Sequence, residues 1–185
     1  MTERLIKELN SLANPEKAQL LQRFFKTGKG EYGEGDIFLG ITSWQIKTIA
    51  KKHKEISLDK IQKLLDSNIH EHRITAIKIL NLQYKKNKET IFNFYLKNTK
   101  NINNWDLVDL SAPNIIGNYL FEKDRKILYN LAKSNDLWEK RIAILSNFYF
   151  IKYNQFEDAL NIAEILIQDK HDLIHKAVGW MLREI

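Results

Sequence analysis

The segment Leu137-Trp-Glu-Lys-Arg-Ile-Ala-Ile-Leu145 contains the pattern that indicates the fold: a polar anchor, Arg141, lies early in an expected helix and an apolar run follows at once. The pattern occurs three more times, with Arg73, Asp109 and Lys176 as anchors, and successive anchors are 36, 32 and 35 residues apart. Helical hairpins that repeat at this period cannot bury their apolar faces alone, so they stack. The spacing therefore predicts an all-α, HEAT-like solenoid, a right-handed α–α superhelix with one concave face, which we expect to be basic.

The distribution of glycine and proline also indicates an all-helical chain. The sequence has 7 glycines and 2 prolines, and five of the glycines lie between Gly28 and Gly40. The rest of the chain is nearly free of residues that break helices. We expect a loop over 28–40, helices that start at Pro15 and at a cap on Thr42 or Ser43, and further helices near residues 3–12, 58–66, 70–86, 90–97, 105–120, 124–133, 137–153, 156–168 and 171–185.

The glycine-rich loop matches the dinucleotide fingerprint G-x-G-x-x-G from Gly28 to Gly33, but its context is wrong for that function. The fingerprint needs a strand before it and a helix directly after it, whereas a helix precedes this loop and its acidic residues would repel phosphate. We interpret the loop as a connector between helices that brings Trp44 to the surface. The apolar pattern of the next helix nevertheless places Trp44 in a buried stripe with Ile46, Ile49 and Ala50.

Length and composition limit the classes of protein that the chain can belong to. It has 185 residues, 44% of them hydrophobic and 28% charged, as in one globular domain. The absence of cysteine excludes disulfides, thiolate metal sites and cysteine nucleophiles, and fits a reducing cytoplasm. No apolar run approaches the roughly 20 residues of a membrane span, and the start lacks a signal-peptide core. We therefore expect a cytoplasmic protein without a membrane partner.

The charge balance favours a polyanionic partner. There are 29 Lys and Arg against 23 Asp and Glu, a net charge of +6, and the pI is about 9.3. Such an excess favours nucleic acid as the first candidate, although solvated lysine-rich faces give the same number.

Familiar catalytic and metal-binding motifs do not fit. His171 and His175 have the spacing of a zinc-hydrolase pair, but Asp172 replaces the general-base glutamate and no third ligand is evident. No Ser/His/Asp or Gly-x-Ser-x-Gly arrangement occurs. We expect no metal and no cofactor.

One constellation remains that can carry chemistry. Trp105 lies four residues before Asp109 and Trp180 four residues after Lys176, so each tryptophan shares a helical face with an anchor. If equivalent positions line the concave face, two indoles, a carboxylate and the guanidinium of Arg141 lie on neighbouring repeats. Aromatic faces and a carboxylate suit a cationic ligand or transition state. The structural alternative is that the tryptophans are core residues and that the Asp/Arg pair ties two repeats together.

Four segments resemble the AlkD-type DNA alkylation repair family. They are Tyr32-Gly-Glu-Gly-Asp-Ile-Phe-Leu-Gly-Ile41, Asn104-Trp-Asp-Leu-Val-Asp109, the segment 137–145 quoted above and Lys176-Ala-Val-Gly-Trp-Met-Leu-Arg-Glu184. The resemblance implies a HEAT-like solenoid that binds duplex DNA in its concave face and hydrolyses the N-glycosidic bond of N3- and N7-alkylated purines, without necessarily flipping the base. It assigns catalytic roles to Trp105, Asp109, Arg141 and Trp180. Because this family normally continues for another helical repeat, residues 1–185 are expected to be a single HEAT-like domain that lacks that repeat.

The expected reaction requires the protein to position a few side chains around the substrate and needs no general acid. A purine alkylated at N3 or N7 is already cationic, so it leaves without a general acid, and the sugar becomes an oxocarbenium ion. Asp109 would stabilise that charge and position water, while Arg141 would hold a phosphate or orient Asp109; the sequence does not choose between these roles. We expect Lys47, Lys176 and Arg183 to bind DNA on or beside the concave face. We also expect the protein to act as a monomer and to be associated with the nucleoid when it is bound to DNA. The alternatives are a non-catalytic HEAT-like DNA-binding or damage-sensing module and a protein-interaction solenoid.

Overall fold

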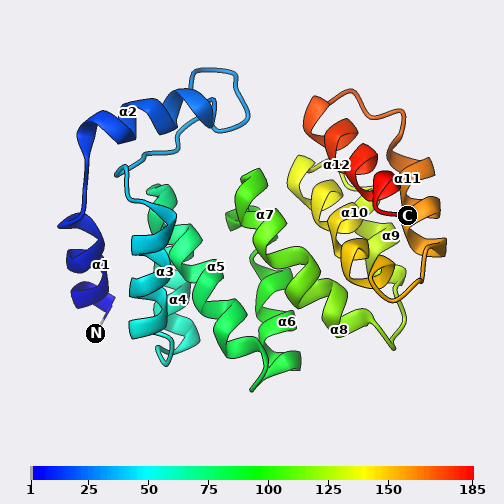
Figure 1. Cartoon of the computed structure of the whole chain (residues 1–185), viewed down its shortest axis with the longest axis horizontal. Helices are drawn as coiled ribbons and strands as arrows, with labels where there is room; N and C mark the ends of the chain where they lie inside the picture. The colour runs from blue at the N-terminus through cyan, green and yellow to red at the C-terminus, as the bar shows by residue number, and fades with distance from the viewer. Residues whose placement is uncertain (1) are drawn as a thin grey trace. The chain divides into compact units, whose positions relative to one another are not determined.

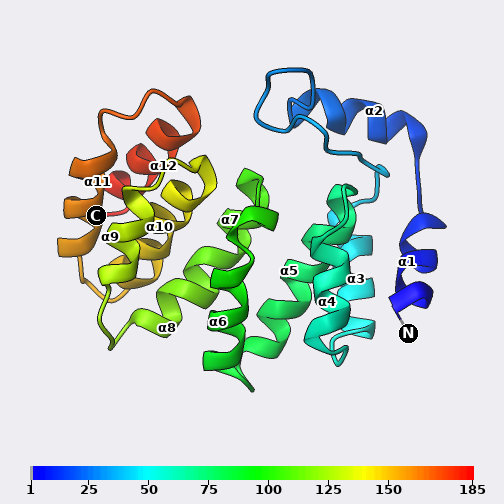
Figure 2. The same cartoon turned by 180° about the vertical axis from the view of Figure 1, so that it is seen from behind.

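The computed structural model describes residues 2–185, and all of its regular structure is helical. No strand occurs in this range; the nearest approach to one is an isolated parallel bridge between Ile37 and Ile69. The chain divides into two compact units, the residues up to Asn87 and the residues from Lys88 to Ile185 (Figures 1 and 2). Within each unit, helices pack on helices that follow shortly in the sequence. The predicted all-α class of stacked helices is confirmed.

The described residues of unit 1 form five helices, and side-chain caps fix the starts of two of them. Asn14 accepts a hydrogen bond from the backbone N–H of Lys17, and Pro15 occupies the first helical position. Thr42 and Gln45 form a reciprocal capping box, so Thr42 rather than Ser43 is the cap. The helices are α1 (Thr2–Asn10), α2 (Pro15–Phe24), α3 (Ser43–Lys52), α4 (Leu58–Leu65) and α5 (His70–Tyr84).

The glycine-rich loop joins α2 to α3 and is fixed by its own carboxylates and by α5. Glu31 and Glu34 accept hydrogen bonds from the backbone N–H groups of Gly28 and Gly30. The buried Glu71 accepts from the backbone N–H groups at positions 39, 40 and 41. Donors that could otherwise cradle a phosphate are therefore occupied within the protein, in line with the interpretation of the loop as a connector.

Trp44 corrects one expectation. Trp44 is 73% exposed, whereas Ile46, Ile49 and Ala50 are buried. It is the second residue of α3, two residues before Ile46 and five before Ile49, so it points away from the helical face that these two residues bury. The placement of Trp44 in the buried stripe is wrong, and its place at the surface agrees with the connector interpretation.

Unit 2 is organised around α10, which contacts the helices on both sides of it. Its helices are α6 (Lys88–Lys97), the 3₁₀ turn η1 (Thr99–Asn101), α7 (Trp105–Ser111), the π-helical segment η2 (Ala112–Gly117), α8 (Asn118–Leu120), α9 (Lys126–Ala132), α10 (Leu137–Ile151), α11 (Glu157–Leu166) and α12 (Asp172–Arg183). Ten of the fifteen residues of α10 are buried. This burial is possible because α10 packs against α7, η2, α9, α11 and α12.

The helix expected over 105–120 has the predicted extent but changes its winding in the middle. Pro113 has no backbone N–H to donate to the carbonyl of Asp109, as an α-helix would require. The chain winds as a π-helix from Ala112 to Gly117 instead. Gly117 lies directly against α10, because a Cβ there would overlap the carbonyl oxygen of Ser146.

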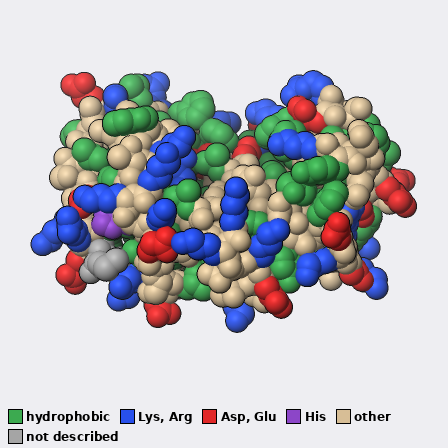
Figure 3. Space-filling model, turned by 60° about the horizontal axis from the view of Figure 1, so that its bottom comes forward, with side chains coloured by type: hydrophobic (Ala, Val, Ile, Leu, Met, Phe, Trp, Pro, Cys, Tyr) green, Lys and Arg blue, Asp and Glu red, His purple; other side chains and the backbone are tan. Residues whose placement is uncertain are grey.

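One face of the molecule carries both basic and acidic side chains (Figure 3). On the face shown in Figure 3, lysine and arginine side chains are spread among acidic and apolar ones. No helix within residues 2–185 is long and apolar enough to cross a membrane.

Candidate active site

Asp109 is positioned by a helix whose start is fixed by Asn104. The buried Asn104 accepts a hydrogen bond through its side chain from the N–H of Trp105 at 2.8 Å, so α7 begins at Trp105. Asp109 follows one turn later, on the face that Trp105 shares. Its carboxylate remains 19% exposed, and Trp105 is half-buried. The start of α7 thus presents an indole and a carboxylate that solvent can reach.

Arg141 holds the carboxylate of Asp109 through a two-pronged interaction. Its Nε donates to Oδ1 and its Nη2 to Oδ2, each at 2.8 Å. Its Nη1 donates to the backbone carbonyl of Leu173 at 2.6 Å. Arg141 is 5% exposed, and its guanidinium connects α7, α10 and the first turn of α12. Every guanidinium nitrogen already donates within the protein.

The surroundings of Asp109 oppose its charge. Burial raises the pKa of Asp109 most strongly, and the neighbouring carboxylate of Asp106 raises it further. The hydrogen bonds and charge of Arg141 lower the pKa, but they do not outweigh burial. The net shift is upward, so the fold maintains a carboxylate at a place where its negative charge is disfavoured.

Unit 1 contains a comparable aspartate–arginine pair, in which the pKa of the aspartate is lowered instead of raised. Asp36 meets Arg73 at 2.6 Å and His70 at 3.4 Å, and its side chain is only 5% exposed. Burial raises the pKa of Asp36, but His70 and Arg73 together lower it more, so the net shift is downward. The Asp36 carboxylate is almost fully buried and its partners stabilise its charge. The Asp109 carboxylate is more exposed, and Arg141 does not fully offset the cost of burying its charge.

Trp180 is the second tryptophan that the sequence singles out, and it is half-buried on α12. Its ring lies 5.6 Å from that of Phe148 on α10, and its Nε1 donates to Glu184 at 3.0 Å. Phe148 follows Arg141 by seven residues on α10, so both lie on one face, about 10 Å apart along the helix. The same face of α10 therefore contacts Asp109 near its start and Trp180 two turns later.

Two of the predicted DNA-binding residues share a side of α12 with Trp180. Lys176 and Arg183 are exposed and lie four residues before and three residues after it. Lys176 also meets Asp172 at 2.9 Å in an exposed pair. Lys47 is exposed on α3 of unit 1. The contribution of all three residues to DNA binding stays a prediction.

The histidines of the apparent zinc motif have local structural roles. His171 caps α12 by accepting a hydrogen bond from the N–H of Leu173 at 3.2 Å. His175 is hydrogen-bonded to the backbone carbonyl of Asp169. Among residues 2–185 no three His, Asp or Glu side chains gather as a metal site would require.

Several residues around the site were not assigned a role from the sequence. The Leu173 carbonyl that anchors Arg141 has no sequence signal at all, because any residue offers a carbonyl. Phe148 and Glu184 do have one: Phe148 is seven residues after Arg141, and Glu184 is four residues after Trp180.

The fold and the site together define a helical-repeat protein with a partly buried carboxylate, held by arginine, beside a tryptophan. The chain belongs to the DNA alkylation repair enzyme family, whose model matches residues 5–185. It is therefore placed among DNA repair enzymes, with DNA as its partner. The predicted resemblance to a DNA alkylation repair family is confirmed at this level.

Solved structures show the same fold. One is described as a "Predicted DNA alkylation repair enzyme from Enterococcus faecalis", with a TM-score of 0.70 and 17% sequence identity. The match covers 93% of this chain and 82% of the other. No curated protein sequence matches the chain.

Proposed function

We propose that the protein is an AlkD-type DNA glycosylase, which hydrolyses the N-glycosidic bond of cationic N3- or N7-alkylated purines in duplex DNA. We propose further that it acts as a monomer without a metal or cofactor. Membership of the DNA alkylation repair family supports a repair reaction. The observation that carries the proposal is the partly exposed Asp109 carboxylate, which Arg141 holds beside Trp105.

The reaction begins with heterolysis of the bond between C1′ and the purine nitrogen. The electron pair goes to the base and neutralises its positive charge, so the leaving group needs no proton. The sugar becomes an oxocarbenium ion, which the negative charge of Asp109 and the indole faces of Trp105 and Trp180 stabilise. Water then adds to C1′ and loses a proton to Asp109 or to solvent. The products are a free alkylpurine and an abasic site.

Arg141 acts in this proposal by orienting Asp109 and not by binding phosphate. Its buried guanidinium donates to both carboxylate oxygens and to the carbonyl of Leu173. Three of the five N–H groups of the guanidinium are used in these hydrogen bonds. Arg141 is only 5% exposed, so the remaining two are buried away from an approaching phosphate. DNA phosphates are left to Lys176, Arg183 and Lys47, whose side chains are exposed.

A second candidate function is a non-catalytic module that binds DNA or senses damage. It is favoured by the similarity between the Asp109–Arg141 pair and the sealed Asp36–Arg73 pair, which ties the glycine-rich loop to α5. In that case Asp109 serves the fold and not a reaction.

Replacement of Asp109 by asparagine distinguishes the two functions. Asp109→Asn keeps the size of the side chain and removes its charge. Electrostatic groups of this kind contribute about 3 to 4 kcal/mol to catalysis, so release of free N7-methylguanine should slow by roughly a hundred- to a thousandfold. DNA affinity should hold or rise, because a negative charge near phosphates is removed. Single-turnover excision and melting temperature are measured on the same preparation.

Asp158→Asn is the matched control. Asp158 lies in the same unit, is also 19% exposed and pairs with Arg125 at 2.7 Å. It also accepts a hydrogen bond from the hydroxyl of Tyr129, and we assign it no role in the reaction. Its loss should lower the melting temperature and leave excision per folded molecule unchanged. If Asp109→Asn behaves in the same way, Asp109 is a structural tie and the second candidate stands.

A further inference from the structure

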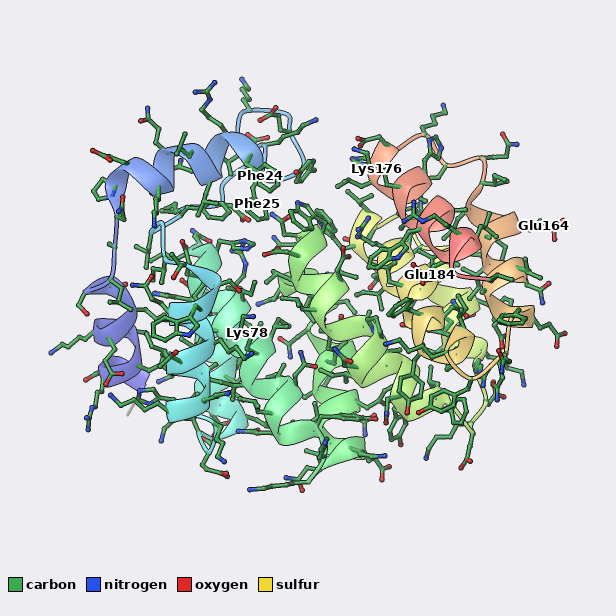
Figure 4. The ribbon with its side chains drawn as sticks, viewed as in Figure 1. Phe24, Phe25, Lys78, Glu164, Lys176 and Glu184 are labelled. Atoms are coloured by element: carbon green, nitrogen blue, oxygen red, sulfur yellow. The ribbon has the colours of Figure 1, made fainter. Side chains whose placement is uncertain are left out.

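Glu184 holds the indole of Trp180 at one edge. The Nε1–H of Trp180 donates to Oε1 of Glu184 at 3.0 Å, across one turn of helix. Glu184 is also the C-cap of α12, and its backbone N–H is bonded to the carbonyls of Trp180 and Met181. Its main chain is thus fixed where its side chain reaches the indole. Figure 4 shows Glu184 at the C-terminal part of α12, with Lys176 near the other end.

Phe148 supports the same indole from α10. The two ring centroids are 5.6 Å apart with the planes at 46°. Lys152, one turn further along, places its Nζ 4.3 Å from the centre of the Phe148 ring. The indole of Trp180 therefore contacts an aromatic ring and a carboxylate while it remains partly open to solvent.

We infer that Glu184 is a positioning residue for Trp180, and that its carboxylate strengthens the attraction of the indole for a cationic ligand. The inference rests on the proposed function, because the cation is the alkylated nucleotide or the sugar that it leaves. A hydrogen bond to an ionised acceptor is stronger than one to a neutral acceptor, so it restricts the indole to fewer orientations. Negative charge at the N–H edge also increases electron density on the ring, whose faces attract cations.

Two substitutions of Glu184 separate its effect on the position of the indole from the effect of its negative charge. Glu184→Gln keeps an acceptor for Nε1–H but removes the negative charge, whereas Glu184→Ala removes both. Glu184 is exposed, so neither change disturbs the core. The matched control is Glu164→Gln, an exposed glutamate of α11 whose side chain points outward in Figure 4.

The first measurement is nuclear magnetic resonance of the tryptophan indole N–H groups, which does not depend on activity. The chain has 4 tryptophans and so gives four indole signals, which single Trp→Phe variants assign. The Trp180 signal should move in Glu184→Ala, move less in Glu184→Gln and stay in place in Glu164→Gln. An unmoved Trp180 signal in Glu184→Ala means that the hydrogen bond is absent in solution, and overturns the inference.

The second measurement is single-turnover release of N7-methylguanine. The excision rate should fall roughly three- to tenfold in Glu184→Ala and by a smaller factor in Glu184→Gln. Affinity for undamaged duplex should hold or rise in both variants. If the wild type releases no base, the proposed function fails. If the wild type excises and Glu184→Ala excises equally fast, the inference fails alone.

A pair of DNA probes tests the charge preference directly. One duplex carries a pyrrolidinium ring at an abasic position, and the other carries the neutral tetrahydrofuran ring. Glu184→Ala should lose several-fold more affinity for the cationic duplex than for the neutral one. Equal losses on both duplexes contradict a charge effect at Trp180.

Discussion

At the scale of single residues, the environment decides what a carboxylate can do. Asp36 and Asp109 each pair with an arginine, yet the pKa of Asp36 is lowered and that of Asp109 is raised. Burial raises the pKa in both cases. The difference is that Asp36 also has His70 as a partner, whereas Asp109 has the like charge of Asp106 nearby. Upward shifts of this kind are more common at functional sites than elsewhere, which supports a reaction at Asp109.

The opposite shifts predict opposite pH dependences of stability. The stabilising contribution of Asp36 is present above the pKa of the unfolded state, about 3.9, and is lost as pH falls. The contribution of Asp109 is fully present below that value and is lost as pH rises through its raised folded-state pKa. Asp36→Asn should therefore cost more unfolding free energy at about pH 7 than at about pH 3. Asp109→Asn should show the reverse order.

Urea unfolding of both variants and the wild type at these two pH values measures the effect. The raised pKa of Asp109 also predicts that, as pH is lowered, the excision rate begins to fall at a higher pH than it would with an aspartate of ordinary pKa. If the loss of unfolding free energy in Asp109→Asn is larger at about pH 7 than at about pH 3, the pKa of Asp109 is not raised in the folded protein.

At the scale of helices, much of the architecture could be predicted because helix breakers and caps act locally. The starts at Pro15, Thr42 and Trp105 follow from residues adjacent in sequence. The connector interpretation of the loop predicts the exposure of Trp44, whereas the apolar pattern assigned to α3 does not. The hydrogen bond from Arg141 to the carbonyl of Leu173 could not be predicted, because it depends on which helix packs against α10. The Asp109–Arg141 pair was foreseen only as one of two alternatives. The periodicity of apolar residues shows which face of a helix is buried, but it does not show which atoms of another helix contact that face.

Gly117 tests how closely η2 and α10 must pack. An added Cβ would overlap the Ser146 carbonyl oxygen and lie 2.8 Å from the Cβ of Tyr149. Backbone atoms of a packed helix cannot move aside cheaply, so Gly117→Ala should lower the unfolding free energy by about 1 to 3 kcal/mol. Gly179→Ala is the control, because a Cβ there meets nothing within 4 Å. It should be neutral or stabilising by up to about 1 kcal/mol. Equal effects in denaturant unfolding would show that η2 and α10 do not require this approach.

At the scale of the whole molecule, the net charge of +6 has two explanations. The excess either binds DNA phosphates at particular places or is distributed over solvated faces. Figure 3 shows basic and acidic side chains intermixed on one face, so the total alone does not distinguish these explanations. Lys176 and Arg183, which flank Trp180 on α12, and Lys47 on α3 are the positions at which a specific contact is proposed.

Salt dependence of duplex binding tests these three positions. Each phosphate contact releases condensed counterions, so the logarithm of affinity falls with the logarithm of salt concentration by about 0.9 per contact. Lys176→Gln, Arg183→Gln and Lys47→Gln should each weaken binding to any sequence and flatten the slope by about one unit. Fluorescence anisotropy with an undamaged duplex over a range of salt concentrations gives the slope.

Lys126→Gln is the control for general electrostatic attraction. The side chain of Lys126 is 88% exposed on α9, and no DNA contact is proposed for it. Its removal lowers the net charge by the same amount as the other three changes. If the slope flattens equally in all four variants, the attraction belongs to the total charge and not to the α12 residues. If it flattens for Lys176 and Arg183 but not for Lys47, the phosphate contacts are confined to unit 2, where Asp109 and Trp180 lie.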